Sequence, residues 1–107
     1  MNSLTITETI HNSGIIERRL DGLLHSESLP CIQTPEGYEE WRLYGQFHRV
    51  DSPAIICPDG TKEYWFHGKL HNLSGPAIIL PNGSCQYWIY GVNYTKKEFD
   101  EKVDNIT

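Results

Sequence analysis

The chain of 107 residues has little cysteine and no recognisable metal-binding pair. Its three cysteines, Cys31, Cys57 and Cys85, are odd in number, and no CxxC or CxxH pair occurs. Neither a disulfide framework nor a structural zinc site is therefore expected. We expect free thiols in a reducing compartment, which points to a cytoplasmic protein.

Long apolar runs and basic clusters are also lacking. No run approaches the roughly 20 apolar residues that a membrane span needs, and the N-terminus has neither a basic nor an apolar signal region. Nine Lys and Arg stand against fourteen Asp and Glu, for a net charge of -5. That balance is ordinary for a small soluble protein and disfavours phosphate binding. We expect no membrane partner and no nucleic-acid partner.

A catalytic constellation is missing as well. No glycine-rich phosphate loop occurs, and no set of nucleophile, base and orienting residue is visible. Cys57 could pair with His48 or His67, but no oxyanion-hole motif accompanies them. Glu39 and Glu40 would point to opposite faces of a strand, so they cannot act as a pair. The sequence predicts a protein that is not an enzyme and has no cofactor and no metal.

The chain does contain two series of glycines, each with a period of 23 residues, which we call the glycine comb. One series is Gly22, Gly45, Gly68 and Gly91, and the other is Gly14, Gly37, Gly60 and Gly83. A fixed period of this length indicates a stack of repeats in which each unit contacts its neighbours. The expected single domain, 1–107, has a degenerate N-terminal hairpin (1–22), three repeats (23–91) and a capping segment (92–107).

Each repeat has the chemistry of a β-hairpin. Ala54–Cys57 is apolar and β-branched, as in a strand. Pro58-Asp59-Gly60 then suits a type I turn followed by a left-handed glycine, and Pro81-Asn82-Gly83 repeats it. The glycines of the other series are expected to reverse the chain between hairpins.

The predicted fold is mostly β. We expect stacked antiparallel hairpins that form one elongated twisted sheet, with both faces partly covered because both side-chain parities carry bulky residues. Thr95 and Glu98 form a capping box, and Phe99 and Val103 follow at helical spacing. A short helix over about 95–104 should therefore cap the last hairpin.

Three histidines, His25, His48 and His71, share one position in the repeat. A ladder of imidazoles could bind a metal or an anion. Successive hairpins would, however, lie about 9–10 Å apart, which is too far for shared ligation. We expect each imidazole to hydrogen-bond its own connection and hold the turn.

The aromatic residues admit a structural and a functional interpretation. Most of them should form the cross-strand pairs that stabilise a thin sheet. Tyrosine and tryptophan are also the residue types that dominate protein-binding hot spots. The candidates for partner binding, near the comb glycines or out of phase with the repeat, are Tyr38, Trp41, Tyr44, His67, Tyr90 and Tyr94.

The repeat signature resembles that of MORN-like repeat proteins, which occur in bacteriophages, large DNA viruses and bacteria. Its best copy reads Gly68-Lys69-Leu70-His71, Gly75-Pro76-Ala77, Pro81-Asn82-Gly83, Tyr87-Trp88 and Gly91. The first copy departs from it, with Leu29-Pro30-Cys31 in place of Gly-Pro-Ala and its tryptophan one place early, at Trp41. The resemblance implies a β-hairpin repeat fold with a binding or scaffolding role, and no shared catalytic residues.

The sequence thus favours a non-enzymatic protein-binding module, a small phage accessory protein that binds and inhibits a host defence protein. The partner would be a host or viral protein. One alternative is a module that sequesters a nucleotide-like signal with aromatic rings, His, Arg42 and Arg49. Another is a structural component that self-assembles, and a homodimer through the sheet edge or face is left open.

Overall fold

The computed structural model describes residues 5–106 and shows one open antiparallel sheet with a C-terminal helix. In chain order the strands are β1 (Ile6–Ile10), β2 (Ile16–Leu20), β3 (Leu23–Leu24), β4 (Ile32–Gln33), β5 (Glu39–Glu40), β6 (Arg42–Leu43), β7 (Gln46–Phe47), β8 (Ile55–Ile56), β9 (Lys62–Glu63), β10 (Trp65–Phe66), β11 (Lys69–Leu70), β12 (Ile78–Ile79), β13 (Cys85–Ile89) and β14 (Val92–Tyr94). The predicted mostly-β fold is confirmed.

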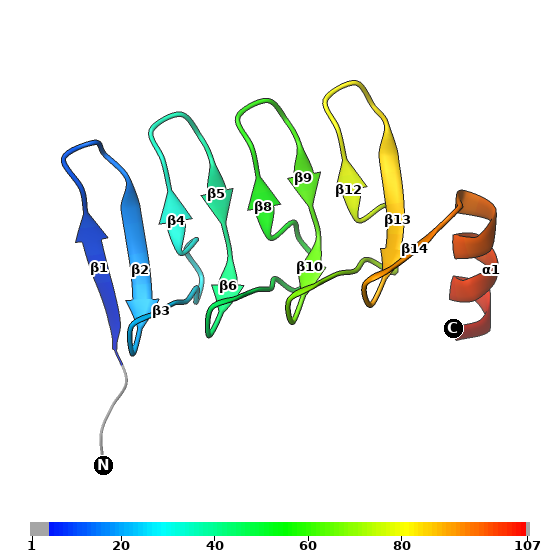
Figure 1. Ribbon diagram of the computed structural model, residues 1–107, viewed down its shortest axis with the longest axis horizontal. Coiled ribbons are helices and arrows are strands. Elements are labelled where there is room, and N and C mark those ends of the chain that lie inside the picture. The colour runs from blue at the N-terminus through cyan, green and yellow to red at the C-terminus, as the bar shows by residue number, and fades with distance from the viewer. Residues whose placement is uncertain (1–4, 107) are drawn as a thin grey trace, which may run out of the picture.

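The large sheet runs in the order β1-β2-β4-β5-β8-β9-β12-β13-β14, and β3 branches from β2. Two smaller pairs, β6-β7 and β10-β11, extend the second and third hairpins. Figure 1 shows the hairpins side by side, with their long loops along one edge and tight turns along the other. The molecule measures 46 × 38 × 17 Å, so it is broad and thin.

The long loops are the predicted turn-plus-bulge hairpins. Gly60 has φ 98°, and its N–H donates to the carbonyl of Cys57 at 3.0 Å. Cys57 N–H donates to the carbonyl of Thr61, and Thr61 N–H donates to the carboxylate of Asp59, both at 2.9 Å. Only glycine takes a left-handed φ at no steric cost, which explains this series of the comb.

The tight turns hold the other glycine series. Tyr44 and Gly45 have φ 48° and 85°, and His67 and Gly68 have 48° and 79°. Two successive positive φ values define a type I′ turn, the two-residue connection that matches strand twist. Gly68 N–H also donates to the carbonyl of Phe47 at 2.8 Å, so each tight turn is tied to the preceding repeat.

The core is a single thin row beneath the sheet. Its most buried position recurs every 23 residues, at Cys31, Ala54 and Ala77, each 0% exposed. At this position the chain passes between two strands, because Ala54 N–H bonds the Glu63 carbonyl while its own carbonyl accepts from Trp41 N–H. A side chain with no exposed surface has little room to grow, which agrees with the small residues at this position.

Helix α1 (Lys96–Ile106) ends the array beside β13 and β14 (Figure 1). The capping box forms as expected: Glu98 N–H donates to the Thr95 hydroxyl at 3.2 Å, and Thr95 N–H to the Glu98 carboxylate at 2.9 Å. Phe99 is 5% exposed and packs against Tyr87, with ring centroids 4.9 Å apart. Within residues 5–106, no helix combines the length and apolarity that crossing a membrane requires.

Candidate partner-binding surface

The three repeat-phased histidines fasten one repeat to the next. In each case the imidazole Nδ1 accepts the backbone N–H of the residue 19 positions later, at the start of the next tight turn. These bonds join His25 to Tyr44 at 3.0 Å, His48 to His67 at 2.9 Å and His71 to Tyr90 at 2.9 Å. Each histidine holds a turn as expected, but through Nδ1 it is the turn of the next repeat and not of its own connection, because the folded array places that turn within reach of the ring. His25 also contacts its own connection, with Nε2 at 3.3 Å from the Glu27 carboxylate.

These bonds require a neutral ring with the proton on Nε2, because a protonated Nδ1 cannot accept. Burial lowers the pKa of His48, and neighbouring His67 lowers it further. Burial also lowers the pKa of His71. Both imidazoles are therefore neutral at physiological pH.

Each histidine ring also lies against the residue whose N–H it accepts, and this builds a continuous surface of rings. His48 and His67 have centroids 4.2 Å apart, and His71 and Tyr90 stack at 3.9 Å. Phe66 joins the two pairs, at 4.5 Å from His67 and 6.4 Å from Tyr90. We call these five residues the ring cluster. His67 and Tyr90 are exposed, so the cluster faces solvent.

Two grooves lie between successive connections of the array. The large groove, about 540 Å³, runs between 49–51 and 71–76 over Tyr64 and Phe66. The small groove, about 450 Å³, runs between 26–28 and 48–50 over Trp41 and Leu43. The residues that line the two grooves occupy equivalent positions of successive repeats, 23 residues apart. Phe66 and His71 belong to both the ring cluster and the large groove, so the two form one continuous surface.

The rings at the bottom of the grooves are covered differently. The Arg49 guanidinium carbon lies 3.7 Å from the centroid of the Trp41 ring. One repeat on, Asn72 takes the place of Arg49. Its Nδ2 donates to the Pro76 carbonyl at 2.9 Å, as Arg49 Nη1 donates to the Pro53 carbonyl at 3.1 Å, but Asn72 has no guanidinium to lie on the ring. Among the described residues, Tyr64 in the large groove has no cation–π contact like that of Arg49 on Trp41.

Side chains of the other parity form a row of hydrogen bonds, one in each repeat. In every copy a donor bonds an acceptor two residues earlier. The pairs are Arg19 to Glu17 at 3.2 Å, Arg42 to Glu40 at 2.6 Å, Trp65 to Glu63 at 2.9 Å and Trp88 to Gln86 at 3.0 Å. The sequence prediction that Trp41 is shifted by one place is explained, because Arg42 takes the position held by tryptophan in later copies.

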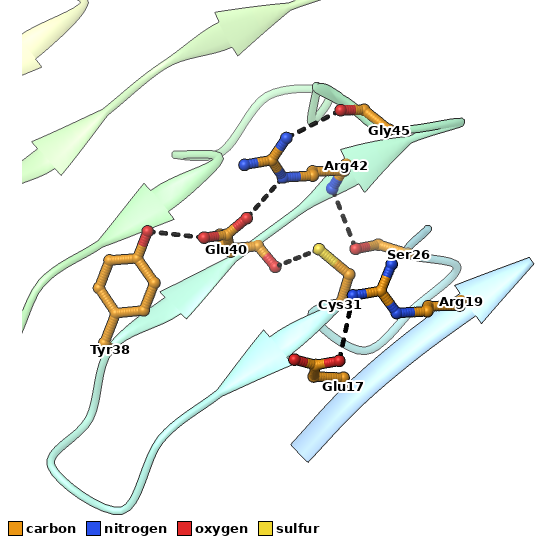
Figure 2. Close-up of polar contacts among 8 residues, drawn as sticks. All are labelled: Glu17, Arg19, Ser26, Cys31, Tyr38, Glu40, Arg42 and Gly45. Carbon is orange, nitrogen blue, oxygen red and sulfur yellow. Dashed lines mark hydrogen bonds and ion pairs between the residues drawn. The ribbon is translucent and has the colours of Figure 1, made fainter. Parts of the chain in front are cut away.

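Figure 2 shows this bond in the first full repeat, where it forms part of a polar cluster. The Glu40 side chain is 7% exposed and accepts from the Tyr38 hydroxyl at 2.7 Å as well as from Arg42. Arg42 also donates to the Gly45 carbonyl at 2.8 Å. Burial raises the pKa of Tyr38, and the bond to Glu40 raises it further. Burial likewise raises the pKa of Cys31, so neither group is an activated nucleophile.

The structure brings together only some of the candidates chosen from the sequence. His67 and Tyr90 join the ring cluster. Tyr44 is 57% exposed, and its ring lies tilted against His25, one repeat away from the ring cluster, with centroids 4.6 Å apart. Trp41 is 7% exposed beneath Arg49.

The remaining two candidates lie elsewhere. Tyr38 bonds Glu40 on the polar row. Tyr94 is half-buried in β14, opposite Tyr87 of β13.

Sequence reasoning missed the residues that connect the ring cluster to the large groove, namely Tyr64, Phe66 and Asn72. A signal was present in the repeat alignment. Trp41 and Tyr64 share one phase, and so do Arg49 and Asn72. Comparing the two phases would have shown a ring that loses its arginine in the next copy.

The part of the chain that the structure describes contains no group of three or more His, Cys, Asp or Glu placed to hold a metal ion. Comparison of the chain with models of protein families, with curated proteins and with solved structures finds no match. The arguments for function therefore start from the ring cluster, the two grooves and the polar row.

Proposed function

We propose that this chain is a non-enzymatic protein-binding module and that its binding surface is the ring cluster with the large groove. The observation that carries the proposal is the continuity of the two: exposed His67 and Tyr90 are joined through Phe66 to a groove of about 540 Å³. Exposed aromatic rings beside a pocket are the usual make-up of an interface hot spot.

The rest of the array supplies a rigid support for this surface. The histidine bonds and the tight-turn bonds fix each repeat to the next, so the rings are ordered before a partner arrives. Ordering the rings in advance lowers the entropic cost of association. In this proposal the stacked hairpins are the scaffold, and the rings at their tight-turn edge make the contact.

The test is a pull-down from bacterial lysate with a variant that removes rings but keeps the turns. Asparagine tolerates positive φ, so His67→Asn with Tyr90→Asn should preserve both type I′ turns. Asp21 already occupies this position in the first turn, with φ 52°. We expect the wild type to retain a protein in stoichiometric amount and the double variant to lose it.

Tyr44→Asn is the matched control, because it changes the same turn position outside the ring cluster. It should retain the partner as the wild type does. If the wild type retains nothing, or if the double variant retains as much protein as the control, the proposal is wrong.

A planar small molecule is the second candidate. The observation that favours it is the presence of Tyr64, Phe66 and Arg49 in one groove, since rings and a guanidinium can hold a nucleotide-like ligand. A thermal-shift screen against cyclic nucleotides tests it, because a ligand that binds only the folded state raises Tm. A rise in the wild type that is lost in Tyr64→Ala would support this alternative.

A further inference from the structure

The position of Arg49 on Trp41 shows how this fold covers the aromatic ring at the bottom of a groove with its own chain. The guanidinium lies 3.7 Å from the ring centroid, and Nη1 donates to the Pro53 carbonyl at 3.1 Å. A guanidinium over an aromatic face is attracted by the ring quadrupole, and its planar N–H donors reach nearby carbonyls. The small groove is therefore an internal example of arginine recognition.

In the last repeat, a different side chain covers the equivalent ring. Tyr87 holds the phase of Trp41 and Tyr64, and Phe99 of α1 packs on it at 4.9 Å. In the first and the last of the three full repeats, a side chain of this chain thus covers the ring. In the middle, Asn72 folds back to bond Pro76 and Ser74, and Tyr64 stays half-buried in the wall of the large groove.

We propose that the large groove is a receptor for an arginine side chain of a partner protein, which lies on Tyr64 as Arg49 lies on Trp41. The inference rests on the proposed protein-binding function and names the chemistry of the contact. Asp51, an exposed carboxylate on the wall of the groove, supplies the opposite charge. The net charge of -5 also favours association with a basic partner.

The charge of Arg49, at the edge of the same groove, does not make this an anion site. Its guanidinium is engaged with Trp41 and the Pro53 carbonyl. Glu39 and Tyr64 interact with it electrostatically, and both oppose the lowering of the Arg49 pKa by burial. His71 in the groove wall is neutral, because burial lowers its pKa. Among the residues that line the groove, Asp51 supplies the carboxylate that a cationic ligand can pair with.

The experiment is an NMR titration of the full chain with Nα-acetyl-arginine methylamide. The citrulline analogue, which has the same shape without the charge, and the lysine analogue serve as controls. We expect saturable shifts of the Tyr64, Phe66 and Asn72 amides with the arginine probe, and binding of citrulline at least about fivefold weaker, the factor typical of one cation–π contact.

Two substitutions exchange the properties of the grooves. Asn72→Arg should fill the large groove from within and weaken binding of the arginine probe at least about fivefold, whereas Asn72→Gln, which adds length without charge, should not. Arg49→Asn should uncover Trp41 and add a second set of saturable shifts around the small groove. Should Asn72→Arg fail to fold, the citrulline comparison and Arg49→Asn still decide the question.

Equal shifts with arginine and citrulline, or shifts that Asn72→Arg leaves unchanged, would overturn the inference. So would saturable binding of a nucleotide in the groove without binding of the arginine probe. The two proposals fail separately. A partner that is lost with the ring-cluster variant but retained by Asn72→Arg would support the protein-binding function and remove the arginine receptor.

Discussion

The first full repeat and the last one use the same hydrogen bond with different chemistry. Arg42 bonds Glu40 at 2.6 Å in a cluster where the Glu40 side chain is 7% exposed (Figure 2). Trp88 bonds Gln86 at 3.0 Å, and Gln86 is exposed. The fold thus needs a donor two residues after an acceptor, and charge is optional. The partly buried ion pair of the first full repeat and the exposed neutral pair of the last one should differ in how much each stabilises the fold.

The largest effect is expected where the charged pair is broken. Glu40→Ala leaves Arg42 and the Tyr38 hydroxyl without their acceptor. We expect a loss of about 2–3 kcal/mol in the free energy of unfolding, on the low side for buried pairs because Arg42 keeps its bond to Gly45. Urea unfolding followed by tryptophan fluorescence measures it.

The control is Gln86→Ala, where an exposed neutral bond should cost roughly 0.5 kcal/mol or less. Glu40→Gln combined with Arg42→Trp copies the last repeat and should recover part of the loss seen in Glu40→Ala. Equal losses for Glu40→Ala and Gln86→Ala would show that the two repeats do not differ in this way.

A second comparison concerns the buried small position, held by cysteine in the first repeat and by alanine later. Ala77→Leu would force extra volume into a fully buried position and should cost about 2 kcal/mol. Ala77→Cys should cost much less, since Cys31 occupies the same phase at 0% exposure. Thermal unfolding of the two variants checks this, and a leucine variant as stable as the cysteine one would contradict it.

The smallest expected effect is the response of the inter-repeat histidines to acid. The pKa values of His48 and His71 are lowered in the fold, so the unfolded chain binds more protons as the pH falls below about 6.5. Stability present above that pH is therefore lost progressively as the pH falls through the folded pKa values. We expect a loss of stability between about pH 7.5 and 5 that is smaller than the losses above, because both imidazoles are only partly buried and remain open to solvent screening.

The control is the double variant His48→Gln with His71→Gln, which removes both titratable imidazoles. Its unfolding free energy, measured in urea over the same pH range, should fall less than that of the wild type. A parallel fall in the two proteins would mean that other groups account for the acid response.

Much of the fold follows from local patterns. The Asp59-Gly60 and Asn82-Gly83 pairs specify their hairpin loops, because the side chain accepts a hydrogen bond two residues on and glycine takes the positive φ. Thr95 and Glu98 specify the start of α1 through two reciprocal bonds. The helix was predicted to end near residue 104 and continues to Ile106, a difference typical of frayed helix ends.

The candidate site was less accessible to sequence reasoning. His67 and Tyr90 were chosen for their place beside comb glycines, and both lie on the ring cluster. Trp41 was chosen as an exception to the repeat, and it lies beneath Arg49. The period says which residues are equivalent, but whether a ring is exposed depends on the side chain that the next repeat places over it.

By itself, the sequence determined the 23-residue period, both kinds of turn and the helical cap, since each depends on residues a few positions apart. The tertiary structure decided where each histidine finds its partner and which aromatic ring is left open. Those outcomes depend on neighbouring hairpins and on the reach of single side chains, as in the difference between Arg49 and Asn72. Stacking the repeats brings such residues together, and that is why Tyr64 lies in an open groove while Trp41 is covered.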